Sequence, residues 1–273
     1  MNMTQDNVGP LKQLGNSVRD VFFFFYPLGR RARKTKVFYL ISFLPVILAG
    51  IFKFSQIFTG EPRFEGIYIF SNMIMGFYLQ FLILILALFY GTSVCSEELE
   101  GKTLTYLTTR PVSKSAIILG KYAAYTLLIT LMVVIGLVFS FLILNVNDLL
   151  DFSLYKILFR NMAVLVLGLI CYTAFFTMIG TFLKRSIMFG LIFSFGWENV
   201  IQYFPGSTQR FAVAHYLKSL LPTQQGSEGF AFLLFRLNPT PPALAVFVLF
   251  LITAVFLTIA CVVFSWQEYI LQD

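Results

Sequence analysis

The chain has 273 residues, of which 58% are hydrophobic and 18% aromatic, and only 12% carry a charged side chain. Soluble domains carry about 25% charged residues, so this composition excludes an ordinary soluble protein and predicts an all-α integral membrane protein. The formal net charge of +7 is attributed to Lys and Arg beside cytoplasmic helix ends, and no nucleic-acid partner is expected.

Residues 1–36 are expected to form a cytoplasmic N-terminal segment with an amphipathic interfacial helix. Residues 18–26 are rich in aromatic side chains, and residues 30–36 are rich in Arg and Lys. This combination suits a helix whose rings lie among the headgroups and whose cations contact acidic membrane lipid. An ordinary stop-transfer flank is the alternative. The apolar part is too short to predict a cleavable signal peptide.

Residues 37–273 are expected to form a six-helix transmembrane permease domain. Most of the apolar runs reach the roughly 20 residues that a helix needs to cross the hydrocarbon core. They are longer than barrel strands and lack their alternation. The fifth run is short, because Trp197 and Glu198 stand near its outer end. The six expected spans are residues 37–58, 67–94, 116–144, 157–183, 187–204 and 243–265.

The positions of the cations predict the orientation. If the N-terminus is inside, more of the 20 Lys and Arg residues fall on the inner side than on the outer side. We therefore expect a multi-pass protein of the cell (inner) membrane with both termini cytoplasmic. Residues 205–242 are then outside, and their prolines, glycines and short apolar patches predict re-entrant or interfacial helices.

A dense polar island at about residues 95–115 separates the second span from the third. An ionised side chain at the bilayer centre costs roughly 2.5–3.5 kcal/mol, so the island must face water. Ser96 is interpreted as the cap of a short helix that begins with Glu97 and Glu98, whose charges favour a helix N-terminus. Pro111 would end this segment, and Ser113 would cap the next helix. The short helix would present charge to a cytosolic partner; a solvated loop without a partner is the alternative.

Enzymatic interpretations of the island fail. Residues 100–103 contain the Gly-Lys-Thr ending of a phosphate-binding loop, but Ser96 stands where the first glycine is required. The paired glutamates faintly resemble those of intramembrane prenyl-protein proteases, yet the single histidine, His215, is expected across the membrane. The same separation removes the base that Ser93 would need as a nucleophile. No catalytic residue and no metal site is expected, and no disulfide or metal pattern joins the three cysteines Cys95, Cys171 and Cys261.

The island and the start of the third span resemble the hallmark of ABC-2 type transporter permeases. The order is Glu97-Glu98-x-Glu100-Gly101-x-Thr103-Leu104, followed by Pro111-Val112-Ser113-Lys114 and then Gly120-Lys121. In that family an acidic segment between spans two and three precedes Gly-Thr-Leu, a proline, a Ser with a basic residue, and a lysine that opens span three. A weaker similarity, through Trp197-Glu198 and His215-Tyr216, is to the permease branch linked to multicopper-enzyme maturation.

The resemblance implies a transmembrane permease subunit of an ATP-binding cassette exporter, without a catalytic site or cofactor of its own. ATP and Mg would be bound by a separate ATP-binding cassette subunit, two copies of which would dock on a permease pair, expected to be a homodimer. The residues that would couple the chain to the ATPase are Glu97, Glu98, Glu100, Gly101, Lys102, Thr103, Leu104, Arg110, Pro111, Lys114 and Lys121.

Two questions stay open at this level. The alternative function is a non-transporting membrane anchor or scaffold that recruits a cytosolic ATPase or another factor. The substrate is not readable, because Lys53, Arg160 and Glu198 stand near the outer ends of their spans and are interpreted as snorkelling to water.

Overall fold

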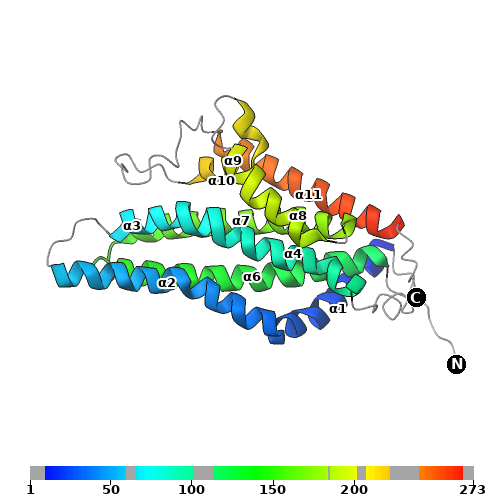
Figure 1. Cartoon of the computed structure of the whole chain (residues 1–273), viewed down its shortest axis with the longest axis horizontal. Helices are drawn as coiled ribbons and strands as arrows, with labels where there is room; N and C mark the ends of the chain where they lie inside the picture. Colours follow the sequence, from blue (N-terminus) through cyan, green and yellow to red (C-terminus); the bar gives the residue numbers. More distant parts are fainter. Residues whose placement is uncertain are drawn as a thin grey trace.

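The computed structural model describes residues 10–59, 66–100, 113–183, 185–201, 207–221 and 240–266, and these parts are helical apart from short connections. This confirms the all-helical prediction. The helices lie side by side in an elongated bundle (Figure 1). Among the described residues, five helical stretches are long and apolar enough to cross a membrane: Arg33–Phe58, Gly66–Ser96, Lys114–Leu144, Phe152–Phe182 and Pro242–Trp266.

The N-terminal part of the chain forms two helices joined at a bend. Helix α1 (Pro10–Arg31) starts with a proline, which suits the first helical turn, and extends beyond residues 18–26 on both sides. Helix α2 (Arg33–Thr59) follows after Ala32. Helix α1 is amphipathic: Phe25 and Gly29 are buried, whereas Phe23 and Phe24 are exposed. Its location in the membrane interface stays a prediction.

The second apolar stretch is one helical rod with a change of pitch. Helix α3 (Gly66–Met73) continues into the π-helical segment η1 (Ile74–Leu82) and then into α4 (Ile83–Glu100). A π segment widens the turn, and its buried Tyr78 hydroxyl meets Ser140 of the next long helix at 3.1 Å. The hydrophobic pattern predicted the rod but not the change of pitch.

The third and fourth long helices begin at polar caps. Helix α6 (Lys114–Leu144) starts where the Ser113 hydroxyl accepts a bond from the Ala116 amide, as predicted. Helix α7 (Phe152–Phe182) starts five residues before the expected span, because Asp151 caps it through the Ser153 amide at 2.9 Å. We call the two ends of the bundle the Ser113 end and the Asn145 end, after the residues that flank α6.

The remaining helices are shorter, except for the last one. A short apolar helical segment takes the place of the expected fifth span, and residues 202–204 of that span lie outside the described residues. The elements are α8 (Ser186–Ile192), the π segment η2 (Phe193–Glu198), α9 (Asn199–Ile201), the 3-10 turn η3 (Ser207–Phe211), α10 (Val213–Leu220) and α11 (Pro242–Trp266).

Helices α4 and α7 form the centre of the bundle, with α2 along its lower edge and α11 along its upper edge in Figure 1. Two glycines set the distance between α4 and α7. A Cβ atom on Gly91 would lie 2.9 Å from the Thr173 carbonyl oxygen, and one on Gly180 would lie 2.9 Å from the Thr92 carbonyl oxygen. Both helices therefore contact each other through their backbones, and a side chain at either position would push them apart.

We predict that Gly180→Val destabilises the bundle, whereas Gly50→Val does not. The added side chain at position 180 meets the α4 backbone, and such overpacking costs about 1–3 kcal/mol. Nothing lies within 4 Å of a Cβ atom at Gly50, so this variant is the matched control. Thermal unfolding of the detergent-purified protein is the measurement. Equal unfolding temperatures for both variants would contradict the packing argument.

Candidate functional site

The polar island lies at the Ser113 end of the bundle. Helix α4 runs without interruption through Glu97, Glu98 and Glu100, so the expectation that Ser96 caps a new helix is wrong. An N-cap residue has non-helical backbone angles, and no glycine or proline before Gly101 interrupts α4 beyond the close-packed Gly91. The glutamates therefore extend the second long rod at its C-terminal end.

The rest of the expected coupling segment lies outside the described residues. These positions are Gly101, Lys102, Thr103, Leu104, Arg110 and Pro111. The structure does describe both sides of the segment, since α4 ends at Glu100 and α6 begins at Lys114. The segment thus connects the ends of two helices that pack directly on each other.

Lys114 connects the start of α6 to the end of α11. Its ammonium group donates to the Ser265 carbonyl oxygen at 3.4 Å, and the hydroxyl oxygens of Ser115 and Ser265 are also 3.4 Å apart. Both contacts lie on the same turn of α6. The start of α6 therefore contacts the end of α11 through two polar side chains.

Lys121 faces α1 and not the open surface. It is 1% exposed, and its ammonium nitrogen lies 4.7 Å from the ring centroid of Phe25 and 5.8 Å from that of Tyr125. Cation–π contacts of this kind are stronger when they are withdrawn from water. One residue earlier, a Cβ atom on Gly120 would meet the Val18 carbonyl oxygen at 2.9 Å, so α1 rests on the α6 backbone here.

A second lysine joins the same group of rings from α2. The Lys34 ammonium donates to the Ser93 hydroxyl at 2.9 Å and lies 5.3 Å and 5.4 Å from the ring centroids of Tyr90 and Tyr125. Ser93 is thus part of a contact between α2 and α4. We call Phe25, Lys34, Tyr90, Lys121 and Tyr125 the lysine–aromatic cluster. It holds four helices together one to two turns from the island.

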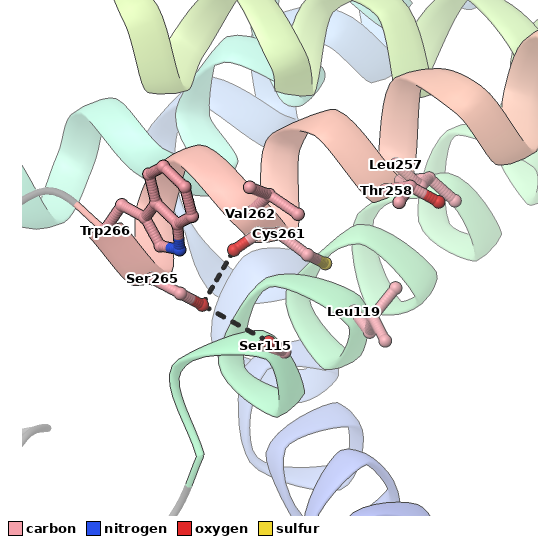
Figure 2. Close-up of a pocket in the computed structure, with 8 residues that line it drawn as sticks. All are labelled: Ser115, Leu119, Leu257, Thr258, Cys261, Val262, Ser265 and Trp266. Carbon is pink, nitrogen blue, oxygen red and sulfur yellow. Dashed lines mark hydrogen bonds between the residues drawn. The ribbon is translucent and has the colours of Figure 1, made fainter.

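A surface groove of about 340 Å³ opens between α6 and α11 at the Ser113 end (Figure 2). It is lined by Ser115 and Leu119 of α6 and by six residues of α11 between Leu257 and Trp266. The Ser265 hydroxyl donates to the Cys261 carbonyl oxygen at 2.7 Å, and that of Thr258 donates within α11 as well. The hydroxyls of Thr258 and Ser265 are therefore engaged within α11, and Ser265 also meets the Ser115 hydroxyl of α6 across the groove.

The sequence analysis missed a buried polar group around Glu198. The interpretation of Glu198 as a snorkelling side chain is wrong, since it is 1% exposed. Its Oε1 accepts bonds from the Tyr172 hydroxyl at 2.5 Å and the Ala214 amide at 2.7 Å. The two cations interpreted together with Glu198 donate to carbonyl oxygens at helix ends: Lys53 to Leu144 at 3.3 Å and Arg160 to Leu220 at 2.8 Å.

Lys218 and His215 belong to the same buried region. They are 6% and 2% exposed and lie on α10, a helix that hydrophobic periodicity alone did not place against α7. Burial lowers the pKa of Lys218 to about 8, and the negative charge of Glu198 opposes this shift. The signal available in the sequence was a single acidic residue, Glu198, and a single lysine, Lys218, on two neighbouring apolar segments.

The described residues hold no group of three or more His, Cys, Asp or Glu side chains that could bind a metal ion. The three cysteines are free; Cys95 and Cys171 are buried, and Cys261 is half-buried. A histidine and a hydroxyl do meet in these parts of the chain, since His215 Nε2 lies 3.0 Å from the Thr240 hydroxyl.

Comparison with known proteins gives one family match. The model of a family described as ABC-2 family transporter protein matches residues 30–197, which is more than half of the chain. The matched part includes α2, the island and both helices beside it. A search of curated proteins finds no match to this chain.

We predict that Phe25→Leu loosens α1, whereas Phe23→Leu leaves it unchanged. The first variant removes the ring below the Lys121 ammonium, and a desolvated cation–π contact contributes about 0.5–2 kcal/mol. Phe23 is 66% exposed and is the matched control. Hydrogen exchange of the amides of residues 17–31 should become roughly two- to thirty-fold faster in Phe25→Leu only. Identical exchange in both variants would contradict the claim that the lysine–aromatic cluster holds α1 in place.

Proposed function

Because the chain belongs to the ABC-2 family of transporter proteins, we propose that it is the permease subunit of an ATP-binding cassette exporter. It moves a substrate across the cell's inner membrane with ATP that is hydrolysed on a separate subunit. The observation that carries this proposal is the family match over residues 30–197, which covers the polar island and four of the five long apolar helical stretches.

We propose six membrane crossings with both termini in the cytoplasm. The five long stretches supply five crossings, and the short apolar segment Ser186–Glu198 with the residues that follow it supplies the sixth. The Ser113 end is the cytoplasmic end in this arrangement, because the excess of Lys and Arg falls there. Residues 1–36 then precede the first crossing on the inner side, and residues 205–242 form the outer element.

The coupling segment of the proposed permease is the island. Glu97, Glu98 and Glu100 continue α4 into the cytosol, where they supply negative charge for the groove of an ATPase subunit. Gly101, Lys102, Thr103, Leu104, Arg110 and Pro111 complete the segment, and Lys114 and Lys121 fix its connection to α6. Three observations support this role: α4 rests on α7 through two glycines, Lys114 contacts α11, and Lys121 contacts α1.

The contacts of α4 and α6 with α7, α11 and α1 would let a movement of the island change the arrangement of the bundle. Nucleotide-driven closure of two ATPase subunits would push the two coupling segments of a permease pair together. Helices α4 and α6 would then carry α7, α11 and α1 with them, and the bundle would tilt from inward-open to outward-open. Only a difference in docking energy between the two states drives such a change, since equal binding to both shifts nothing.

The proposed partners follow from this mechanism. Two ATP-binding cassette subunits bind ATP and Mg, and a second copy of the chain completes a homodimer. Apolar side chains on α2 and α11 stand exposed, among them Leu40, Phe58, Phe247 and Phe250. In a membrane these faces meet lipid or the second copy. A scaffold that recruits an ATPase without transport would use the same island but would not stimulate ATP turnover.

We predict that Glu98→Lys and Glu100→Lys weaken binding of the ATPase subunit, because each reverses a charge that faces the partner. Pull-down in mild detergent should recover several-fold less ATPase than with the unaltered chain, and permease-dependent ATP hydrolysis in proteoliposomes should fall with it. Asp148→Lys is the matched control, a charge reversal at the exposed Asn145 end. Unchanged recovery and unchanged hydrolysis in both glutamate variants would defeat the assignment of the island.

We predict that the two ends of the bundle label from opposite sides of the membrane. Ser113 and Asp148 are both exposed, so cysteines introduced there react readily. On a Cys261→Ser background, a membrane-impermeant maleimide added to intact spheroplasts should label Asp148→Cys at once. Ser113→Cys should react only after permeabilisation. The reverse pattern would overturn the proposed orientation.

A further inference from the structure

Glu198 stands at a junction between two separate pieces of the chain. It is the last residue of η2, which belongs to the helical segment that follows α7 in the chain. The second piece is α10, which comes later in the chain. Figure 1 shows α9 and α10 next to each other on the upper side of the bundle. The family match ends at residue 197, so neither Glu198 nor α10 lies within the matched part.

The Glu198 carboxylate serves as the N-terminal cap of α10. Ala212 precedes this helix in an extended conformation and provides no side-chain cap. The Ala214 amide, one of the first free amides of α10, donates to Glu198 Oε1 at 2.7 Å. A negative charge at this position is also favoured by the helix dipole.

The same oxygen fixes α10 to the centre of the bundle. The Tyr172 hydroxyl of α7 donates to Oε1 at 2.5 Å, so one atom joins η2, α7 and α10. Lys218 follows one turn after Ala214, and its positive charge and the negative charge of the Glu198 carboxylate attract each other, which partly offsets the cost of burying each. Attraction between opposite charges is stronger away from water than at the surface.

The other end of α10 is held independently. The guanidinium of Arg160 on α7 donates to the Leu220 carbonyl oxygen at 2.8 Å. The Ser219 hydroxyl, in the last turn of α10, accepts a bond at 3.2 Å from the amide of Thr240, which leads into α11. Because Arg160 is nearer the start of α7 than Tyr172, α10 runs along α7 toward the Asn145 end. Glu198 thus anchors the deeper end of a helix whose other end is tied to α7 and α11.

We infer that Glu198 is a positioning residue that makes the segment from α8 to α10 move with α7 as one body. The consequence for transport rests on the proposed function: movement of the island reaches α7 through α4, and Glu198 passes it to the outer element. Removal of the carboxylate frees the N-terminus of α10 from η2 and from Tyr172; α10 stays tied to α7 through Arg160, and the outer element then follows α7 less closely.

The first test measures the anchor in the permease alone, reconstituted in nanodiscs. Hydrogen exchange of the amides at 213–217 should be roughly tenfold or more faster in Glu198→Ala than in the unaltered chain, since a charge-assisted bond is lost. Glu198→Gln keeps an acceptor oxygen without the charge and should give a smaller increase. Equal exchange in all three proteins would overturn the anchor.

A tyrosine pair controls for general loosening of the bundle. Tyr172→Phe removes one donor to Glu198 and should raise α10 exchange several-fold. Tyr122→Phe removes a similar buried hydroxyl, which donates to the Ile170 carbonyl oxygen at 2.9 Å, and should leave α10 unchanged. If Glu198→Ala also speeds exchange in α6, the bundle as a whole has loosened and the Tyr172→Phe variant becomes the test. Exchange in α10 of Tyr172→Phe that equals that of the unaltered chain would then overturn the anchor.

The second test measures the transmission in the complex. Glu198→Gln should recover the ATPase subunit as well as the unaltered chain does, but with several-fold lower permease-dependent ATP hydrolysis. Unaltered hydrolysis together with faster α10 exchange would overturn the positioning role, because the anchor would then be only structural. Failure of the proposed function is distinguishable, since a chain without an ATPase partner would still show the exchange differences.

Discussion

Backbone contact between α4 and α7 is the constraint on which the rest of the structure depends. Gly91 and Gly180 let the two backbones approach closely, so that the carbonyl oxygens of Thr173 and Thr92 lie only 2.9 Å from where Cβ atoms would stand. In a membrane, helices gain little from hydrophobic association, and close packing of small residues takes its place. Helix α4 is consequently held close to α7 at Gly91, one to two turns before its acidic end.

Buried charges are placed where other helices meet this pair. At the Ser113 end, Lys34 and Lys121 lie over the ring of Tyr125 and bring α1 and α2 against α6. On the far side of α7, Glu198 meets Tyr172 and the start of α10. A charge withdrawn from water is costly unless it is compensated, so each group fixes its helices in one arrangement. Helix α7 carries Tyr172 of the second group and packs against α4, which carries Tyr90 of the first.

The outer faces of the bundle follow a different rule. Helix α11 carries exposed Leu244, Phe247 and Phe250, and α2 carries exposed Leu40 and Phe58. Such faces would be unfavourable in water, but they match the hydrocarbon core in polarity. The distribution of side chains is thus the reverse of that in a soluble protein. The lipid-facing surfaces are apolar, and polar residues within the membrane lie between helices, where they specify contacts.

The sequence by itself determined the all-helical membrane class, the five long apolar stretches, the family and the cap at Ser113, because these follow from composition, run length and local spacing. Only the tertiary structure decided that α4 continues through Glu100, that Lys121 faces α1 and that Glu198 is buried. Each of these depends on which helix lies alongside, and side chains far apart in the sequence supply the partners. From the sequence alone, a single glutamate near the end of an apolar run is interpreted as snorkelling, because its hydrogen-bond donors on α7 and α10 are distant in the chain and only the fold brings them beside it.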